Sequence, residues 1–510
     1  MSSPRPIRPH GVGVRGANLS RSSVLFGGPF GRIFRAVPPA DFGVDDAASI
    51  AALTKLAAAM NSPADAPKDG PDPEESGIPA AYTYLGQFID HDLTFDPASS
   101  LQKQNDPEAL VDFRTPRFDL DNVYGRGPDD QPYLFEDGRS FLLGNPLSGA
   151  ASNPRARDLP RSAVSLPGSR NRAIIGDPRN DENVIISQFQ GLLHRFHNKI
   201  AGDHPDWDFA RVQKEVRFHY QWLLLHDFLP TLIAKDVLRD ILPLDDQGSV
   251  VTQKGNLNYY HFRNEPFMPL EFSAAAYRFG HSMVRPGYRL SETIAPLPLF
   301  AVDPNLDLRG FQVFPANWAI DWGLFSDLQP RDPDDTTRTQ LAYRIDTSLV
   351  NPLSVLPESV ATNPNMLALR NLLRGWRMRL PTGQDVARAM GIKPLEDNEI
   401  LIGKFTGDPA DIVGTIDSVD PAFKGNCPLW TYILAETVKT TATLTTTKGN
   451  KNIETRKLGP VGGTIVAETF LGILLGDSSS YVSLDPLWKP SLTINGVFGL
   501  RELIAAALQG

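Results

Sequence analysis

Hydrophobic positions recur at helical spacing through most of the chain, and few segments show the period of two that strands have. The strongest stretch is residues 182–201, where apolar side chains share one helical face. Proline closes two further stretches, at Pro230 and Pro381. The predicted helices are 45–60, 81–96, 182–201, 208–229, 231–241, 271–285, 363–380, 383–390, 428–436, 459–475 and 497–508. The predicted fold class is therefore mainly α.

The segments between these helices are predicted to be irregular. Residues 1–45 are rich in Gly, Pro and Arg and read as an extended arm lying over a body. Residues 61–78 and 128–172 read as loops, and the Thr- and Lys-rich residues 438–458 as an exposed loop or ribbon. No repeat of 20–50 residues is present, which argues against a solenoid or a propeller.

The length of 510 residues allows one large domain with appendages or two fused domains. We predict an arm and first helix over residues 1–75 and a single main domain over 76–510. A net charge of −9 without a basic block argues against nucleic acid as a partner. The single cysteine, Cys427, excludes an intrachain disulfide.

No apolar run is long enough to predict a membrane span. The first residues are basic but no apolar stretch follows them, which argues against a cleaved secretory signal. The expected location is the cytoplasm, and export by a route without an N-terminal signal is the alternative. The oligomeric state stays open.

Residues 81–96 (AYTYLGQFIDHDLTFD) place polar side chains in a helix that is otherwise apolar and aromatic. Gln87, Asp90 and His91 fall at i, i+3 and i+4, so they share one face, and Asp92 follows. Burying such side chains is costly unless something pairs with them. The pattern predicts a polar or metallic group opposite this face.

Two further polar clusters stand out. In residues 176–182 (GDPRNDE), Arg179 and Glu182 lie where a long helix begins, and capping by Asp177 or Asp181 is the simpler interpretation. In residues 115–121 (TPRFDLD), alternate positions direct oxygen atoms to one side, which suits a hard cation such as calcium. A solvated acidic loop is the alternative, because the segment lacks the features of an EF-hand.

Among the nine histidines, two remain as candidates for chemistry. His194 and His197 are spaced i, i+3 rather than the i, i+4 of a helical zinc pair, which disfavours a zinc protease. His91 lies in the polar cluster, and His281 follows a glycine in an aromatic segment. Taken alone, each also fits a hydrogen-bonded core histidine.

The motifs GQFIDHD, TPRFDLDNVYG, GDPRNDE, YRFGH and RNLLRG occur in this order along the chain. This set resembles the peroxidase–cyclooxygenase superfamily of animal-type haem peroxidases, and it looks like a bacterial-style member. The resemblance covers roughly residues 80–500. It implies a helical haem-peroxidase domain with few short strands. The implied activity is the oxidation of small organic donors or halides by hydrogen peroxide, through a ferryl haem intermediate.

The resemblance also implies roles for individual residues on the peroxide side of haem b. His91 matches the distal base that takes a proton from peroxide. Arg179 matches the arginine that stabilises negative charge as the O–O bond breaks. Gln87 matches the glutamine that orients water or a halide. Asp90 and Glu182 match carboxylates that form ester links to haem methyl groups.

On the other side of the haem, His281 matches the axial ligand of the iron. Asn371 matches the asparagine that accepts the Nδ1–H of this histidine, and Arg374 matches an arginine that pairs with a propionate. The calcium ligands implied are Asp92, Thr115, Arg117 through its carbonyl, Asp119 and Asp121. Asp121 stands where the family has a serine, and the ion would hold the neighbouring His91 in place.

Two departures from the family pattern bear on function. Asn183 stands where members with a third, sulfonium-type haem link carry methionine, so two ester links at most are expected. Arg278 stands where cyclooxygenases and fatty-acid dioxygenases have a radical tyrosine, and Tyr277 lies one residue earlier, which disfavours that branch. The alternatives are a haem-dependent fatty-acid dioxygenase using Tyr277 and a haem-free, calcium-stabilised binding module.

Overall fold

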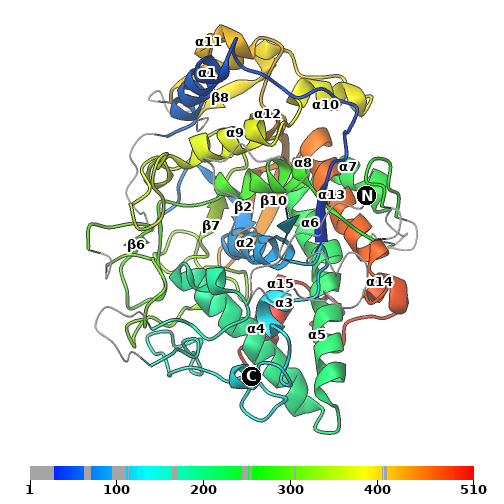
Figure 1. Cartoon of the computed structure of the whole chain (residues 1–510). Helices are drawn as coiled ribbons and strands as arrows, with labels where there is room; N and C mark the ends of the chain where they lie inside the picture. The colour runs from blue at the N-terminus through cyan, green and yellow to red at the C-terminus, as the bar shows by residue number, and fades with distance from the viewer. Residues whose placement is uncertain are drawn as a thin grey trace.

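The computed structural model describes residues 28–62, 70–94, 111–112, 114–163, 171–243, 251, 255–262, 265–303, 306–404, 406 and 411–510. Most regular structure is helical and the strands are few and mostly short, which confirms the mainly α fold class (Figure 1). The longer helices are α1 (Asp46–Ala59), α2 (Ala81–Leu93), α4 (Val184–Asp203), α5 (Phe209–Leu223), α7 (Lys235–Ile241), α9 (Leu367–Arg377), α10 (Gly383–Ala389), α12 (Leu429–Ala435), α13 (Pro460–Gly476) and α15 (Leu500–Ala507).

Short helical turns connect these helices. They are α3 (Asp121–Tyr124), the 3₁₀ turn η3 (Pro178–Asp181), the π-helical turn η4 (Leu224–Phe228), α6 (Leu229–Leu232), α8 (Leu270–Ser273), the 3₁₀ segment η6 (Ala276–His281), α11 (Ile416–Val419) and α14 (Tyr481–Leu484). The helix predicted over 271–285 is therefore wrong in detail: the backbone leaves helical geometry at Ala275, which separates α8 from η6. The helix predicted over 363–380 begins only at Leu367, since Pro364 disfavours helical geometry before it.

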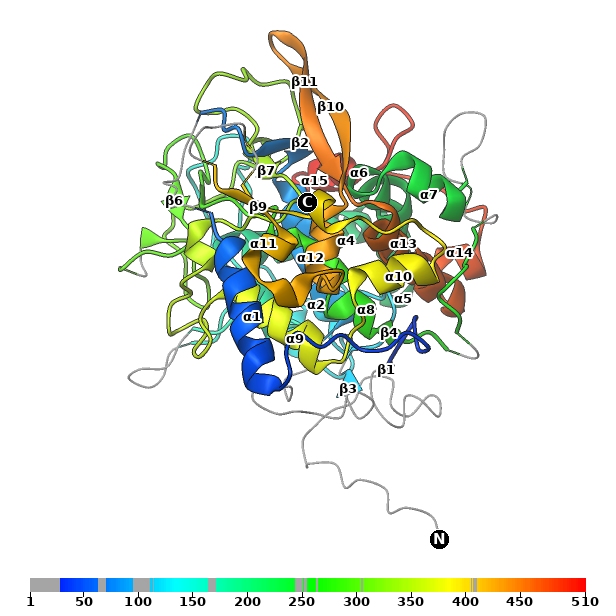
Figure 2. The same ribbon diagram turned by 90° about the horizontal axis from the view of Figure 1, so that it is seen from above.

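The strands form small sheets. They are β1 (Gly28–Gly31), β2 (Glu75–Pro79), β3 (Val111–Asp112), β4 (Met268–Pro269), β5 (Gly287–Tyr288), β6 (Leu297–Pro298), β7 (Leu341–Tyr343), β8 (Leu401–Gly403), β9 (Val413–Thr415), β10 (Val438–Thr446) and β11 (Gly449–Lys457). β1 pairs with both β3 and β4, and the other strands pair as β2–β7, β5–β6, β8–β9 and β10–β11. The β10–β11 hairpin projects from the body (Figure 2), which confirms the ribbon predicted there.

The predicted arm lies partly within the described residues. Glu271 of α8 accepts the backbone N–H groups of Ile33 and Phe34 at 3.1 and 3.0 Å, so this part of the arm is fixed to the body. Phe34 and the α1 residues Leu53 and Leu56 belong to the same hydrophobic core as the remainder of the chain. The division at residue 75 stays a prediction, and residues 1–27 lie outside the described part.

Helix α2 lies at the centre of the molecule and packs against α4 and η6 (Figure 1). Phe88 and Ile89 are fully buried, and the Phe88 ring lies 5.4 Å from Phe189 of α4 and 6.1 Å from Tyr220 of α5. This apolar face fixes the rotation of α2 about its axis. The polar face of α2 is thereby directed toward η6.

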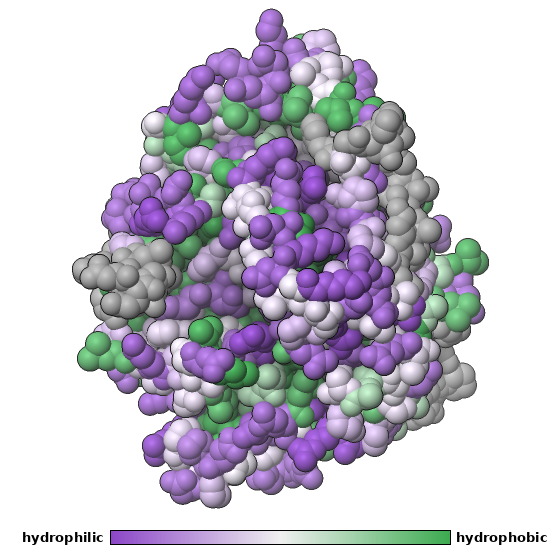
Figure 3. All heavy atoms as spheres, turned by 180° about the vertical axis from the view of Figure 1, so that it is seen from behind, coloured by the Kyte–Doolittle hydropathy of each residue, from purple (hydrophilic) through white to green (hydrophobic). Residues whose placement is uncertain are grey.

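None of the helices in the described part of the chain has the length and hydropathy needed to span a membrane. The face opposite to that of Figure 1 is mostly hydrophilic, with small groups of hydrophobic residues scattered across it (Figure 3).

Candidate active site

A cavity of about 880 Å³ lies between α2, η6 and the segments near residues 299–313 and 353–367. Gln87, Asp90 and His91 of α2 all line it, which confirms that the three share one face. His281 of η6 lines the same cavity. The volume lies within the roughly 300–1,000 Å³ that ligand and cofactor sites have in proteins. Two imidazoles therefore border one space large enough for a cofactor.

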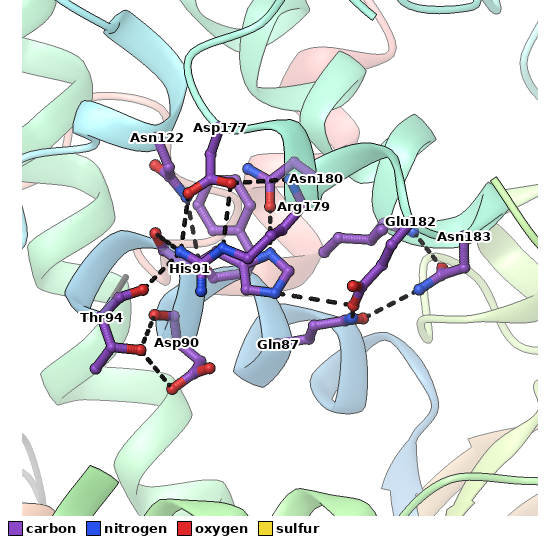
Figure 4. A network of polar contacts seen from close by, with 12 residues as sticks. Gln87, Asp90, His91, Thr94, Asn122, Asp177, Arg179, Asn180, Glu182 and Asn183 are labelled. Atoms are coloured by element: carbon purple, nitrogen blue, oxygen red, sulfur yellow. Dashed lines mark hydrogen bonds and ion pairs between the residues drawn. The ribbon is translucent and has the colours of Figure 1, made fainter. Parts of the chain in front are cut away.

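His91 is buried and is hydrogen-bonded through one ring nitrogen (Figure 4). Its Nδ1 lies 2.6 Å from Asn180 Oδ1, and its Nε2 lies 3.8 Å from Glu182 Oε1. Burial is the main cause that lowers the pKa of His91, and the positive charge of Arg179 is the second. The negative charge of Glu182 acts in the opposite direction and only partly offsets them. Because an amide oxygen only accepts, His91 carries its proton on Nδ1 and has a bare Nε2. His91 is thus a neutral base.

Glu182 and Gln87 form a polar pair on the cavity wall. Gln87 Nε2 donates a short hydrogen bond to Glu182, and Asn183 Nδ2 donates to Gln87 Oε1 at 3.3 Å. Asn183 also caps α4, since its oxygen accepts the N–H groups of Ile185 and Ile186 at 3.1 and 2.9 Å. The same side chain therefore starts α4 and positions the cavity-lining amide.

The capping interpretation of residues 176–182 is corrected in one respect. Asp177 caps η3 rather than α4, by accepting the N–H of Arg179 at 2.8 Å. Asp181 accepts two hydrogen bonds from Arg161, at 2.7 and 2.8 Å, instead of capping a helix. α4 takes its cap from Asn183 because the chain turns once more, through η3, before the helix begins.

Arg179 lies beside His91 but acts on its backbone (Figure 4). Its Nη2 donates to the carbonyl oxygens of His91 at 3.1 Å and Thr94 at 2.6 Å, and it pairs with Asp177 at 2.8 Å. A cation suits these carbonyls because they lie at the C-terminal end of α2. Arg179 is not among the described residues that line the cavity. It fixes the end of the helix that carries His91.

His281 is held by Asn371 of α9, in an orientation that differs from the expected one. Asn371 Nδ2 lies 2.8 Å from His281 Nδ1, while Asn371 Oδ1 accepts a hydrogen bond from Arg278 Nη1 at 3.1 Å. In this arrangement Arg278 occupies the oxygen with which Asn371 was expected to accept the Nδ1–H of His281. Burial, followed by the charge of Arg278, lowers the pKa of His281 to about 3, so the imidazole is neutral.

Asp90 and Arg374 have different relations to the cavity. Asp90 lines it and accepts a hydrogen bond from Thr94 Oγ1 at 3.2 Å. Arg374, one turn after Asn371 on α9, is not among the described lining residues. Burial and the nearby charge of Arg374 together lower the pKa of Arg278 to about 10. The end of the cavity near Arg278 is therefore rich in positive charge.

A cluster of carboxylates lies on the other side of α2. Asp92, Asp119 and Asp121 each bring a carboxylate oxygen within 4.8 Å of the others. Asp92 is fully buried and neither of its oxygens has a hydrogen-bond partner among the described residues. Burial, followed by repulsion from Asp119 and Asp121, raises its pKa well above the usual range. Carboxylate oxygens gathered in this way are the ligands that a hard cation such as calcium prefers.

The surrounding loop explains how these oxygens converge. Leu120 adopts a left-handed φ of 58°, so the segment is not the regular alternation that the sequence suggested. Thr115 Oγ1 donates to Asp119 Oδ2 at 2.8 Å, and the side chain of Arg117 points to Asp477 at 4.0 Å. The carboxylates of Asp119 and Asp121 nevertheless meet at Asp92.

Arg114 connects the acidic cluster to the residues around His91. It is 3% exposed, donates to Asp121 at 2.8 Å and forms a short ion pair with Asp177. Burial alone would raise the pKa of Asp177, but Arg179 and Arg114 hold it well below the usual range. The backbone at Gly176 lies close to the backbone of Asn122. Only glycine fits there, because a Cβ would lie 2.6 Å from the Asn122 carbonyl oxygen.

Sequence reasoning missed Asn180, Arg278 and Arg114 as members of the site. Each stands next to, or inside, a motif that was recognised: Asn180 follows Arg179, Arg278 lies in YRFGH, and Arg114 precedes Thr115. Their partners are distant in sequence, since Arg278 meets Asn371 and Arg114 meets Asp177. Only the fold brings these pairs together.

Several residues of the site lie in a part of the chain that a family model matches. The model of the animal haem peroxidase family matches residues 101–301, which include Arg114–Asp121, Arg179–Glu182 and His281. A chorion peroxidase of Aedes aegypti is 31% identical over 207 residues, which are 38% of this chain and 24% of that protein. The chain thus spans about a quarter of the length of this curated relative.

Two solved structures show the same fold. Peroxidase A from Dictyostelium discoideum aligns with a TM-score of 0.55 and 17% identity, over 94% of this chain and 96% of that one. A fatty acid alpha-dioxygenase of Arabidopsis thaliana aligns with a TM-score of 0.52 and 14% identity, over 92% of this chain and 74% of that one. The family model and the chorion peroxidase therefore match part of this chain, and the two solved structures share its fold.

Proposed function

We propose that this protein is a haem peroxidase that uses hydrogen peroxide to oxidise small organic donors or halides. The observation that carries the proposal is the single cavity bordered by two neutral imidazoles, His91 on α2 and His281 on η6. One can serve as a base while the other ligates a metal. The match to the animal haem peroxidase family supports haem as the cofactor.

The residues around the cavity fit haem. His281 is neutral and would hold the haem iron in this proposal, because neutral imidazole is the form that binds iron. Arg278 lines the cavity and makes no ion pair with a described residue, so it can receive an anionic haem substituent. Bound haem would supply the iron that exchanges electrons with peroxide and with the donor. Arg374 would add positive charge at the same end.

Asn371 would have to respond to haem. Iron ligation through Nε2 of His281 leaves the proton on Nδ1, which then needs an acceptor. Asn371 presents its amide nitrogen there, so its amide must turn over. An anion bound at Arg278 would free the Asn371 oxygen for this purpose. Haem binding and the orientation of His281 are therefore coupled in this proposal.

His91 would carry out the proton transfers on its side of the cavity. The bare Nε2 of His91 accepts the proton from hydrogen peroxide and returns it to the departing oxygen as water forms. Arg179 holds the backbone of His91 through its carbonyl, and Gln87 and Glu182 present polar groups to the bound oxidant. In the described orientation Arg179 acts through position rather than by direct contact with the reactants.

The test is reconstitution of the full chain with haem. We expect a Soret band and peroxide-dependent oxidation of guaiacol without oxygen uptake. Absence of a Soret band after haem supplementation would exclude the peroxidase and favour the haem-free binding module.

A fatty-acid dioxygenase is the second candidate, because one observation favours it. Tyr277 lines the cavity and its buried hydroxyl has no hydrogen-bond partner among the described residues. Burial, followed by the charge of Asp90, raises its pKa well above 10, so the phenol stays protonated. Oxygen consumption that depends on a fatty acid and is lost in Tyr277→Phe would support this reaction over peroxide turnover.

We also propose that two carboxylates attach haem covalently. Asp90 and Glu182 both line the cavity, from α2 and from the turn before α4. We expect that peroxide treatment of the haem-loaded protein makes the haem resistant to extraction by acidified acetone. The double variant Asp90→Asn/Glu182→Gln keeps the shape of both side chains and should release its haem. Complete extraction from the treated parent protein would refute the ester links.

We further propose that the acidic cluster binds calcium through Asp92, Thr115, the Arg117 carbonyl, Asp119 and Asp121. The support is the pair of buried, unpartnered Asp92 oxygens beside two other carboxylates. Calcium prefers such oxygen ligands, and its charge would offset the repulsion that raises the pKa of Asp92. Because Asp92 follows His91 on α2, the ion would hold the base in place.

Calcium binding should depend on pH with a defined sign. A raised carboxyl pKa means that the folded, metal-free protein binds more protons than the unfolded chain, so it loses stability as pH rises above the ordinary aspartate pKa. Calcium displaces those protons, and its affinity should increase with pH. We expect calcium to raise the melting temperature more at pH 8 than at pH 5, and Asp119→Ala to abolish the difference. The exposed Asp335→Ala is the control, and an equal calcium shift at both pH values would contradict the site.

A further inference from the structure

Three buried polar side chains form a series of hydrogen bonds that begins at His91 Nδ1. Asn180 Oδ1 lies 2.6 Å from this nitrogen, and Asn180 Nδ2 donates to Gln190 Oε1 at 2.8 Å. Gln190 Nε2 lies 2.9 Å from His194 Nε2. All three side chains are at most 2% exposed, and none of them lines the cavity. A chain of neutral groups therefore runs from the distal base into the core.

His194 closes this chain in a fixed and uncharged form. Its ring stacks on Phe141, with centroids 4.3 Å apart and planes 5° from parallel. Burial, followed by the charge of His197, lowers the pKa of His194 to about 3, so the ring is neutral. It can accept the Gln190 hydrogen bond only with its proton on Nδ1. In this arrangement the far end of the chain is an acceptor, and His194 Nδ1 has no hydrogen-bond partner among the described residues.

The chain has a direction. Each amide has one accepting and one donating end, so turning a single amide would set two donors or two acceptors against each other. In the described arrangement every junction joins a donor to an acceptor, and an oxygen meets His91. We propose that Asn180, Gln190 and His194 are positioning residues that hold His91 as its Nδ1–H tautomer, with a bare Nε2 toward the cavity.

This inference rests on the proposed peroxidase function for its chemical consequence. Peroxide can give up its proton to His91 only if Nε2 is bare, because an Nε2–H would be a donor instead. A carboxylate behind His91 would also hold Nδ1–H, but it would add a charge. The amide chain fixes the tautomer without adding charge behind the base.

Gln190→Leu tests the proposal, with Gln188→Leu as the matched control on the same helix. Gln188 is also buried, donating to the Trp318 carbonyl at 2.7 Å and accepting from the Ile320 N–H at 2.9 Å, without joining the chain. In ¹⁵N-histidine-labelled full-length protein, we expect His91 to be the Nδ1–H tautomer in the parent and in Gln188→Leu. Gln190→Leu should show a mixture of tautomers.

A second readout is the rate at which cyanide binds the haem-loaded protein, followed by the Soret shift, since hydrogen cyanide must also lose its proton to a base. It should fall about 10- to 100-fold in Gln190→Leu and in Asn180→Leu, while Asn180→Asp, which can still accept from Nδ1–H, should retain it. Equal behaviour of Gln190→Leu and Gln188→Leu, or an Nε2–H tautomer in the parent, would overturn the proposal. The tautomer measurement needs no haem, so failure of the peroxidase function would be seen separately as a missing Soret band.

Discussion

Replacing His281 by alanine is expected to abolish stable haem binding and with it the Soret band of the reconstituted protein. The site offers the iron a neutral imidazole at this position, since burial and Arg278 lower the pKa of His281 to about 3. No other described histidine except His91 lines the cavity. Titration of the variant with haem, followed by gel filtration and an absorption spectrum, measures the loss directly.

External imidazole should restore part of the Soret band in His281→Ala, because the vacated space would admit a free ligand. His219→Ala is the control, because His219 is a buried histidine that lies away from the cavity. If His281→Ala kept the haem spectrum of the parent protein, the axial assignment would be wrong.

His91→Ala is expected to keep its haem and to react with hydrogen peroxide about 10²- to 10⁴-fold more slowly, the usual contribution of a positioned general base. This loss corresponds to about 3–5 kcal/mol of transition-state stabilisation. Stopped-flow spectroscopy of the haem-loaded variant, at several peroxide concentrations, gives the second-order rate constant. The melting temperature of the variant should stay close to that of the parent protein.

The same control, His219→Ala, should react with peroxide at the parent rate. A rate for His91→Ala within a few-fold of the parent would exclude His91 as the base. Comparison with His281→Ala separates the two roles, because only the latter variant should lose the cofactor.

The sequence predicted those parts of the site that depend on one helix. Gln87, Asp90 and His91 share a face because helical geometry alone sets their directions, and the fold confirmed it. Asp119 and Asp121 were expected to converge through strand-like alternation, and they converge through a left-handed Leu120 instead. The two carboxylates were thus correctly predicted to converge, but the spacing of the residues does not show the backbone turn that brings them together.

Contacts between segments distant in sequence were not predictable from spacing. The Asn371 amide turns its nitrogen to His281 because Arg278 takes its oxygen, and this competition depends on how η6 and α9 pack. Likewise, η6 is a 3₁₀ segment where a helix was expected over residues 271–285, although its residues are compatible with both. The packing of this segment, and not its residue types alone, therefore decides its conformation.

The buried guanidinium of Arg114 has a consequence for how the two sides of α2 communicate. It shares one positive charge between Asp121 and Asp177, and Asp177 in turn holds Arg179. A dication at the acidic cluster would compete with Arg114 for Asp121 and leave more of its charge to Asp177. By reciprocity, a ligand whose affinity the cation changes through Arg114 must change the cation affinity by the same factor. The affinity for the cation would then report on the residues around His91, on the other side of α2.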